Sequence, residues 1–248
     1  MPKFFVKHEN ISDEKISIIG EDVNHIKNVL RKNTKDQIEI CDSENGQNYK
    51  CEIEKIGKEN IICSIIKKLE GNSEPDTYVH IYQGLPKADK MELIIQKAVE
   101  LGVSEITPIN MSRCIVKLDG KEQKKKNERW QKISEVAAKQ SGRDIIPRIN
   151  NVCNINEITK QCKEYDITLL AYENEKENSL RKEIEVLKQQ QKEKLKIAVI
   201  IGPEGGIDPE ELEKLHKEGA KVITLGERIL RTETVALNVL SILMYEFE

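Results

Sequence analysis

The sequence predicts an α/β chain in two parts, a small β-rich unit over residues 1–70 and an open α/β domain over 75–248. In the first part, three short runs with strand character follow one another, and a turn at 42–46 joins the first two. After Pro75, apolar strands alternate with amphipathic helices, as in a mainly parallel sheet. The polar stretch 70–75 is the expected boundary.

Each expected element has its own local signal. In the first part these are a short helix at 22–30 and strands at 37–41, 49–54 and 61–66. In the second part the strands are expected at 78–82, 105–109, 166–171, 196–201 and 221–225. Helices are expected at 89–101, 128–141 and 234–247, with a charged surface helix within 173–194. Gly102 ends the first of these helices.

Composition narrows the class of protein. Of 248 residues, 38% are hydrophobic, and no apolar run approaches the roughly 20 residues that cross a bilayer. The N-terminus is too short and too polar for a signal peptide, so we expect a cytoplasmic protein with no membrane partner. The six cysteines contain no Cys-x-x-Cys pair, and Cys51 and Cys63 alternate with isoleucines, so we expect small buried core residues. The four dispersed histidines indicate no metal site.

Charge is unevenly distributed along the chain. Between residues 111 and 148, eleven basic residues face five acidic ones, a formal charge of +6 on a protein of net charge −3. Such a basic belt favours a polyanionic partner. The alternative is a solvated lysine-rich loop, above all at 121–126. Arg113, Arg129 and Arg143 are the better candidates because they flank expected elements.

Two glycine-containing segments indicate a ligand pocket. Each follows an apolar strand, at 202–206 and 225–234, and each precedes a helix. Bare backbone beside a helix start can approach a small polar ligand closely. Between them, Asp208 is an N-cap, Glu211 is placed for a capping box, and Gly219 ends the helix.

The pocket does not have a common nucleotide motif. The chain has no Gly-x-x-x-x-Gly-Lys-Ser/Thr, which argues against a P-loop nucleotidase. The first segment contains Pro203 and lacks Gly-x-Gly-x-x-Gly spacing, which argues against a dinucleotide fold. A tight turn that binds nothing is the alternative.

The final helix is apolar around most of its circumference. Its polar residues Thr234, Asn238, Ser241 and Tyr245 form one narrow stripe. We expect this helix to be buried against a second subunit, with Leu240 facing that partner; burial within one chain is the alternative.

Both glycine segments closely resemble the RsmE family, which are bacterial uridine methyltransferases of the SPOUT superfamily that act on small-subunit ribosomal RNA. The resemblance rests on the segments 201–206 and 225–234. It extends to 25–31, 87–108 and 129–143, so it spans nearly the whole chain.

The resemblance implies an N-terminal PUA-like, RNA-binding β-barrel and a C-terminal α/β methyltransferase domain with a trefoil knot. It also implies S-adenosyl-L-methionine as cofactor, a homodimer, and methylation of uridine N3 in 16S rRNA or the small ribosomal subunit. The expected cofactor-binding residues are Leu170, Ala171, Glu173, Ile201, Gly202, Pro203, Gly205, Gly206, Leu225, Gly226, Ile229, Leu230 and Thr234.

Chemistry guides the remaining roles. A uridine ring nitrogen must lose its proton before it attacks, so a cation that stabilises the uridine anion is required. Arg231 is the candidate, and Glu204 and Glu233 are expected to orient it, to accept the proton, or simply to cap the following helix. The RNA-binding candidates are Arg31, Lys87, Arg113, Arg129 and Arg143.

Two other functions remain open on the sequence. One is a non-catalytic RNA-binding or ribosome-assembly factor that kept the fold, although such a protein has no need of intact glycine segments. The other is a knotted methyltransferase that acts on another RNA, such as tRNA ribose.

Overall fold

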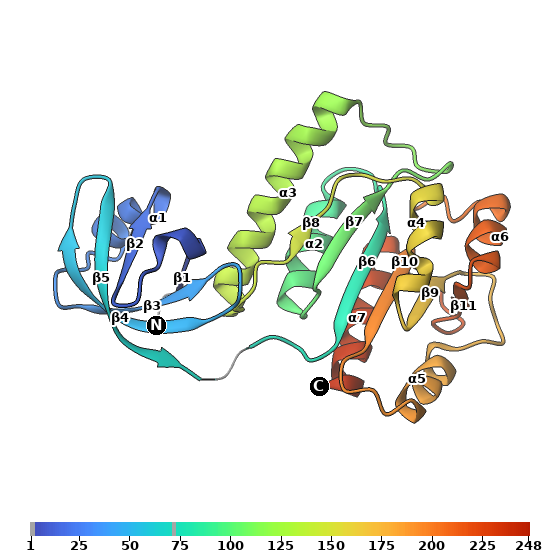
Figure 1. The fold of residues 1–248 in the computed structure, drawn as a ribbon. Coiled ribbons are helices and arrows are strands. Elements are labelled where there is room, and N and C mark those ends of the chain that lie inside the picture. The colour runs from blue at the N-terminus through green and yellow to red at the C-terminus, as the bar shows by residue number, and fades with distance from the viewer. Residues whose placement is uncertain (1–2, 71–72) are drawn as a thin grey trace. The chain divides into compact units, whose positions relative to one another are not determined.

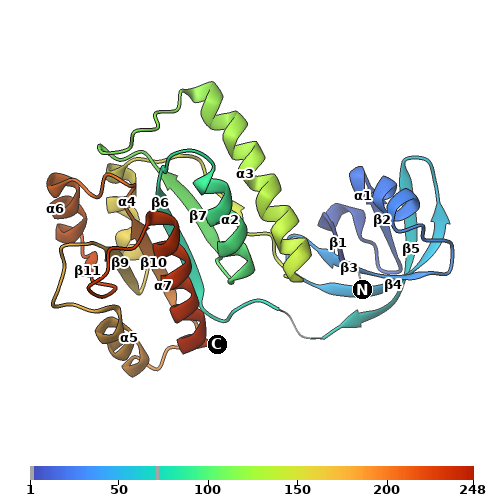
Figure 2. The ribbon, with the colours of Figure 1, turned by 180° about the vertical axis from the view of Figure 1, so that it is seen from behind.

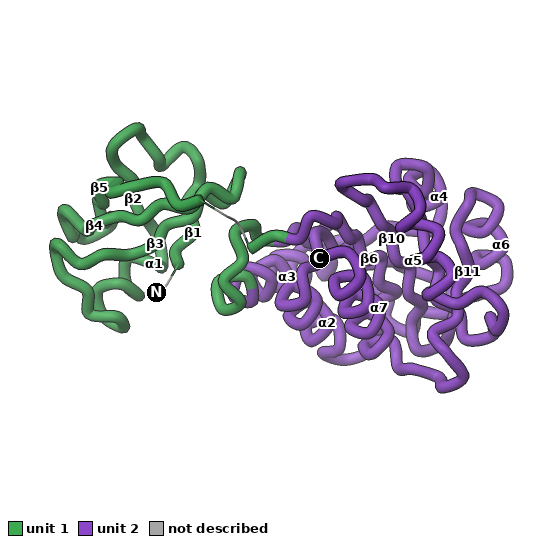
Figure 3. Tube along the Cα trace, turned by 90° about the horizontal axis from the view of Figure 1, so that it is seen from below, with its two compact units in different colours: residues 1–74, 138–146 green, residues 75–137, 147–248 purple. Residues whose placement is uncertain are grey.

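A computed structural model describes residues 3–70 and 73–248 and divides the chain into two compact units (Figure 1, Figure 3). The first comprises Met1–Glu74 together with Ala138–Ile146, and the second comprises Pro75–Ala137 and Pro147–Glu248. The sequence had placed 138–146 in the α/β domain. Gly71 and Asn72, in the expected linker, lie outside the described residues.

The first unit is built on a curled five-stranded sheet with the order β1-β3-β4-β5-β2 (Figure 1). β1 pairs with β3 in parallel, and the other pairs are antiparallel. The strands are β1 (Lys3–Val6), β2 (Lys15–Ile19), β3 (Gln37–Asp42), β4 (Asn48–Ile56) and β5 (Asn60–Leu69).

Alternation along the strands forms the core of this unit. Ile38 and Ile40 of β3 face the same interior as Cys51 and Ile53 of β4 and Cys63 of β5. The prediction that these cysteines are buried core residues is therefore confirmed.

The predicted helix at 22–30 is divided in two. It begins as α1 (Glu21–Asn24) and continues as a π-helical turn over His25–Val29.

The second unit contains a six-stranded sheet with the order β11-β9-β10-β6-β7-β8, and every pair in it is parallel. The predicted α/β fold with a parallel sheet is confirmed. The strands are β6 (Tyr78–Gly84), β7 (Glu105–Ile109), β8 (Arg148–Ile149), β9 (Ile167–Ala171), β10 (Lys196–Ile201) and β11 (Lys221–Ile223).

Helices cover both faces of this sheet (Figure 2). α2 and α7 pack against each other on one face, where α7 contacts β6 and β10, and α4 and α6 pack together on the other. The helices are α2 (Lys90–Glu100), α3 (Gly120–Ser141), α4 (Ile155–Gln161), α5 (Leu180–Gln189), α6 (Pro209–Lys217) and α7 (Thr232–Phe247).

Capping explains where two helices begin. α3 starts well before residue 128, because Asp119 accepts hydrogen bonds from the Lys121 and Glu122 amides and Glu122 bonds back to the Asp119 amide. The lysine-rich stretch 121–126 is therefore helical, and its interpretation as a loop was wrong.

At α6 the predicted N-cap is confirmed, since Asp208 accepts from the Glu210 amide at 3.0 Å. Its predicted capping box is wrong. The Glu211 carboxylate accepts instead from the amide and hydroxyl of Ser112 at 2.9 and 3.1 Å.

The described ranges 3–70 and 73–248 lack two kinds of feature. They contain no helix long and apolar enough to cross a membrane. Nor do the same ranges contain a group of three or more His, Cys, Asp or Glu residues placed to hold a metal ion.

A buried carboxylate ties the segment 138–146 into the first unit. Asp144 is 1% exposed and accepts hydrogen bonds from the Asn48 side chain at 2.7 Å and the Ser73 amide at 2.6 Å, and Lys3 pairs with it. Burial opposes ionisation of Asp144, but the bonds from Lys3, Asn48 and Ser73 outweigh it and lower the pKa.

Replacing Asp144 with Asn should destabilise the protein by about 3 kcal/mol at pH 6, because the largely buried Lys3 ammonium loses its carboxylate partner. The lowered pKa means that this stability is present above the ordinary carboxyl range and is lost as pH falls through the folded value. The difference between wild type and variant in denaturant unfolding should therefore shrink below about pH 4.

The matched control is Glu54→Gln, which breaks the exposed pair between Glu54 and Lys15. This variant should lower the free energy of unfolding by no more than about 1 kcal/mol. A similar cost for both variants would show that Asp144 does not anchor the segment.

Candidate functional site

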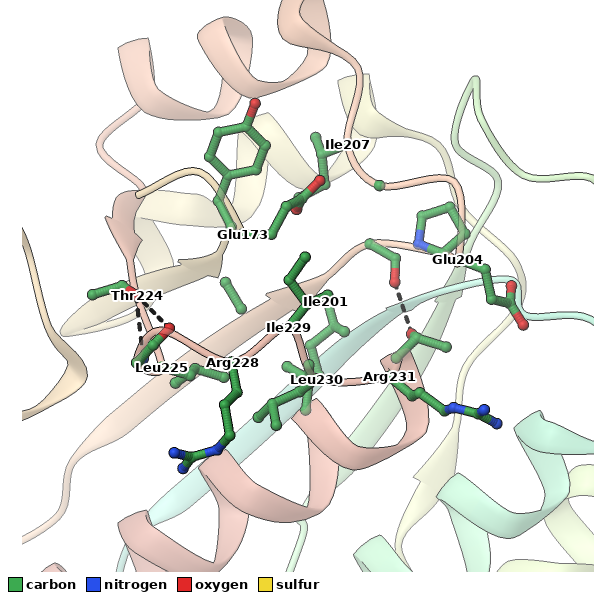
Figure 4. A pocket seen from close by; sticks show the side chains of 18 of the residues that line it. Glu173, Ile201, Glu204, Ile207, Thr224, Leu225, Arg228, Ile229, Leu230 and Arg231 are labelled. Atoms are coloured by element: carbon green, nitrogen blue, oxygen red, sulfur yellow. Dashed lines mark hydrogen bonds between the residues drawn. The ribbon is translucent and has the colours of Figure 1, made fainter. Parts of the chain in front are cut away.

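A cavity of about 440 Å³ lies in the second unit, where β9, β10 and β11 end (Figure 4). Parallel strands bring their carboxyl ends to one edge, so the loops that follow them meet there. Its lining residues are Lys90, Ala171, Tyr172, Glu173, Ile201, Gly202, Pro203, Glu204, Gly206, Ile207, Thr224, Leu225, Gly226, Glu227, Arg228, Ile229, Leu230, Arg231, Thr232 and Val235.

The glycines of the first loop, 202–206, are packed too closely to carry side chains. A Cβ on Gly202 would lie 2.8 Å from Ile207 Cγ1, and one on Gly206 would lie 2.7 Å from Glu173 Oε1. Gly206 also has φ +72°, in the left-handed region. A Cβ on Gly205 would meet the Arg113 carbonyl oxygen at 2.9 Å. These glycines therefore allow the close packing of the loop, and Gly206 also lines the cavity.

The second loop, 224–231, joins β11 to α7 and is more open. Gly226 has φ +107° with no atom within 4 Å of an added Cβ, so its glycine is required by backbone conformation alone. Ile229 is 84% exposed. In Figure 4 the Arg228 and Arg231 side chains extend in different directions from this loop.

Lys90, the first residue of α2, links the first loop to the start of α7. Its ammonium pairs with Glu204 Oε1 of the first loop at 3.0 Å and with Glu233 Oε2 in the first turn of α7 at 3.1 Å. The Lys87 amide also donates to both Glu204 oxygens, at 3.1 and 3.3 Å.

These contacts determine the charge state of both carboxylates. Burial opposes ionisation, but backbone hydrogen bonds and the Lys90 ammonium outweigh it and lower the pKa of both Glu204 and Glu233. The side-chain hydrogen bonds from Lys90 to Glu204 and Glu233 in turn raise the pKa of Lys90. All three groups are therefore charged at neutral pH.

A buried hydrogen-bond chain joins the first loop to α7. The Thr232 hydroxyl donates to the Gly202 carbonyl at 2.7 Å (dashed in Figure 4), and the Gln83 amide donates to the Thr232 hydroxyl at 2.8 Å. Gln83 is fully buried and Thr232 is 6% exposed. Gln83 also donates to the Gly84 carbonyl at 3.0 Å, so β6, the first loop and α7 meet at one point.

Arg231 is the N-cap residue of α7 and is exposed. Its side chain makes no capping hydrogen bond, although N-caps strongly favour Ser, Thr, Asp or Asn. An arginine here works against helix stability, as is common where a residue is kept for function.

Ten of the thirteen expected cofactor residues line the cavity, and three do not. Leu170 is fully buried in β9, Gly205 packs on Arg113, and Thr234 lies in another groove. Of the expected catalytic residues, Arg231 and Glu204 line the cavity. Glu233 does not line it, but it pairs with Lys90, which does. Sequence reasoning assigned no role to eight other lining residues, of which Glu227, Arg228 and Thr232 lie within the second glycine segment: Lys90, Tyr172, Ile207, Thr224, Glu227, Arg228, Thr232 and Val235.

Four of the five RNA-binding candidates are exposed. Arg113 lies beside the first loop, 3.5 Å from Asp208 Oδ2, and Arg129 pairs with Glu92 at 2.7 Å. Lys87 precedes α2, and Arg31, in the first unit, has φ +51°. Arg143 is different. It is 5% exposed and paired with Glu74, so it does not face solvent as an RNA phosphate contact requires, and that expectation is wrong.

The polar stripe of α7 borders a second groove, between α7 and α5. Thr234, Asn238, Ser241 and Tyr245 all line it, and Tyr245 is 86% exposed. Leu240 lies elsewhere, 1% exposed within the chain, so the expectation that it faces a partner is wrong. A helix that packs on both α2 and the sheet buries its apolar positions without a second subunit.

A parallel sheet with a ligand cavity between two glycine loops at its carboxyl edge, in a chain with a separate curled β unit, is the architecture of an RNA methyltransferase. Residues 73–244 match the family described as RNA methyltransferase domain, and residues 18–66 match the RNA methyltransferase PUA domain. The chain belongs to the ribosomal RNA small subunit methyltransferase E family.

Its relatives are similar along nearly their whole length. The chain is 39% identical to ribosomal RNA small subunit methyltransferase E of Bacillus subtilis, over 94% of this chain and 90% of that protein. It is 36% identical to the enzyme of the same name from Mesomycoplasma hyopneumoniae, with 97% and 98% covered.

A solved structure is similar in fold as well. The Neisseria gonorrhoeae ribosomal RNA small subunit methyltransferase E, bound to S-adenosyl methionine, superposes with a TM-score of 0.84 at 27% identity. The match covers 99% of this chain and 97% of that one.

Replacing Lys90 with Met should raise the pKa of both Glu204 and Glu233, because each carboxylate loses its ammonium partner while the other remains nearby. Carbon-detected NMR titration of the carboxyl groups would measure the change. Lys97→Met is the control, since it removes an ammonium of the same helix that pairs with Glu100 at 2.9 Å. Unchanged titration of Glu233 in Lys90→Met would contradict the proposed link.

Proposed function

We propose that this protein is an S-adenosyl-L-methionine-dependent methyltransferase that methylates N3 of a uridine in 16S ribosomal RNA of the small subunit. The observation that carries the proposal is the cavity between the two glycine loops, with Arg231 at its edge. The named relatives act on small-subunit ribosomal RNA.

The cavity suits the cofactor in size and chemistry. At about 440 Å³ it lies in the range of small-molecule sites. Buried Ile201 and Ile207 offer apolar surface for a flat base, and the close backbone of Gly202 and Gly206 offers polar main-chain groups. The carboxylate of Glu173 gives the wall an acceptor. S-adenosylmethionine supplies an electrophilic methyl group when bound.

The proposed cofactor residues keep their expected roles where they line the cavity. These are Ala171, Glu173, Ile201, Gly202, Pro203, Gly206, Leu225, Gly226, Ile229 and Leu230. Gly205 acts indirectly, by letting the loop pack on Arg113, and Leu170 supports the wall from the core.

Arg231 supplies the positive charge that the reaction requires. Its guanidinium stays protonated and stabilises the uridine anion that forms as N3 loses its proton. Glu204 and Glu233 hold Lys90 and orient the cations around the cavity. Their lowered pKa values make them weak bases, so this role suits them better than proton removal.

RNA binding is assigned to exposed cations of both units. Lys87, Arg113 and Arg129 belong to the second unit, and Arg31 belongs to the first. Arginine and lysine contacts to phosphate hold the RNA without reading its sequence. Arg143 is left out of this set because it is buried.

Two further features of the RsmE resemblance are part of the proposal. One is a homodimer in which the groove between α5 and α7 meets a second chain; the exposed Tyr245 and the apolar Leu237 and Ile242 beside it support this. The other is a trefoil knot in the segment that carries both glycine loops. The substrate would place the enzyme in the cytoplasm, where the small subunit is assembled.

Replacing Gly206 with Leu should abolish binding of S-adenosylmethionine. The side chain would meet Glu173 and would strain a residue at φ +72°. Calorimetry on purified protein measures the affinity. Gly219→Leu is the control, because Gly219 has φ +101° but ends α6 with open space around it. Equal affinity in wild type and Gly206→Leu would contradict the proposed pocket.

Replacing Arg231 with Asn should lower turnover by roughly 10²- to 10³-fold, as the loss of an anion-stabilising donor does. Thermal stability should hold or rise, because Asn is a better N-cap than Arg. Single-turnover methylation and thermal unfolding measure the two effects. Lys217→Asn, an exposed cation of α6, should leave turnover unchanged.

The substrate is tested in cells. Mass spectrometry of 16S rRNA from a strain that lacks this protein should show the loss of one N3-methyluridine, and only the wild-type gene should restore it. A full complement of that nucleotide in the deletion strain would refute the proposed function.

A further inference from the structure

We infer that Thr232, oriented by Gln83, is the positioning residue that ties the start of α7, and with it the backbone of Arg231, to the first glycine loop. The sequence assigned a role to neither residue, and neither is placed at the reacting atoms. The inference rests on the proposed function, because it concerns the geometry of the cation that stabilises the uridine anion.

The direction of the hydrogen bonds follows from the groups involved. A carbonyl oxygen only accepts, so the Thr232 hydroxyl must donate its single hydrogen to the Gly202 carbonyl. It can then only accept from Gln83, whose amide nitrogen also donates to the Gly84 carbonyl. Gln83 therefore orients the hydroxyl toward the loop.

The chain of bonds is buried, which makes it rigid. Gln83 is 0% exposed and Thr232 is 6% exposed, so water does not compete for these groups. A buried donor or acceptor that loses its partner carries a desolvation penalty, which keeps the three segments together. The close approach of β6 to the loop requires Gly84, where a Cβ would lie 2.7 Å from the Pro203 nitrogen.

Thr232 is connected to the proposed reaction by its place in the sequence, next to Arg231. Thr232 is the first residue of α7 and directly follows Arg231, whose own side chain caps nothing. On the other side, Glu233 is held by Lys90, which also holds Glu204. The backbone that carries Arg231 is therefore tied to the first loop by a neutral hydrogen bond and by an ion pair.

The test compares Thr232→Val, which keeps the shape and removes the hydroxyl, with Thr232→Ser, which keeps the hydroxyl. Misplacement of a catalytic group by about 1 Å can cost roughly 10²-fold in rate. We expect kcat for RNA methylation to fall by roughly 10- to 100-fold in Thr232→Val, with a smaller change in S-adenosylmethionine affinity. Thr232→Ser should restore most of the turnover.

A double variant separates positioning from general loss of structure. If Thr232 acts through Arg231, then Arg231→Asn with Thr232→Val should be no slower than Arg231→Asn alone. If the two losses multiply instead, Thr232 does not act through Arg231 and the inference is overturned.

Thr168→Val is the matched control for stability. Thr168 is a buried threonine of β9 whose hydroxyl donates to the Cys162 carbonyl at 3.2 Å, away from the cavity. It should lose stability much as Thr232→Val does and keep its turnover. Equal losses of turnover in Thr232→Val and Thr168→Val would show that Thr232 only stabilises the fold, and would contradict the inference.

The outcomes also distinguish this inference from the proposed function. Full turnover in Thr232→Val, together with a slow Arg231→Asn, would overturn the positioning role and leave the methyltransferase proposal intact. Full turnover in Arg231→Asn would instead remove that arginine from the reaction, and with it the basis of the inference.

Discussion

The parallel pairing of β10 between β6 and β9 is the constraint on which the rest of the second unit depends. Because all three strands run in the same direction, the loops that follow them leave from one edge of the sheet. Gln83 near the end of β6, Ala171 at the end of β9 and Ile201 at the end of β10 thus arrive side by side. The cavity exists because of this register.

The two glycine loops reach the same cavity by different physical routes. The first is confined by neighbours, since Ile207, Glu173 and Arg113 occupy the space that side chains would need. The second loop needs its glycine for backbone conformation, because Gly226 has a positive φ although no neighbouring atom crowds it. The crowded first loop is held by its neighbours, whereas the open second loop carries Ile229 and Arg228 at the surface.

Much of the charge around the cavity is paired, and the charge of Arg231 helps to lower the pKa of Glu233. Lys90 satisfies two carboxylates at once, and Arg113 lies against Asp208. Arg231 occupies an N-cap position that its side chain does not cap. The surrounding bonds from Thr232 and Glu233 hold the helix start in place despite that poor cap.

By itself, the sequence determined the elements and the glycine loops, because periodicity, caps and glycine are local signals; strands 105–109 and 196–201 were predicted to the residue. Tertiary structure decided which side chains meet. Glu211 bonds Ser112 rather than its own helix, Arg143 is buried against Glu74, and Leu240 belongs to the core. Lys90 and Thr232 enter the site for the same reason: their partners are far away in the sequence, and only the folded chain brings them within hydrogen-bonding distance.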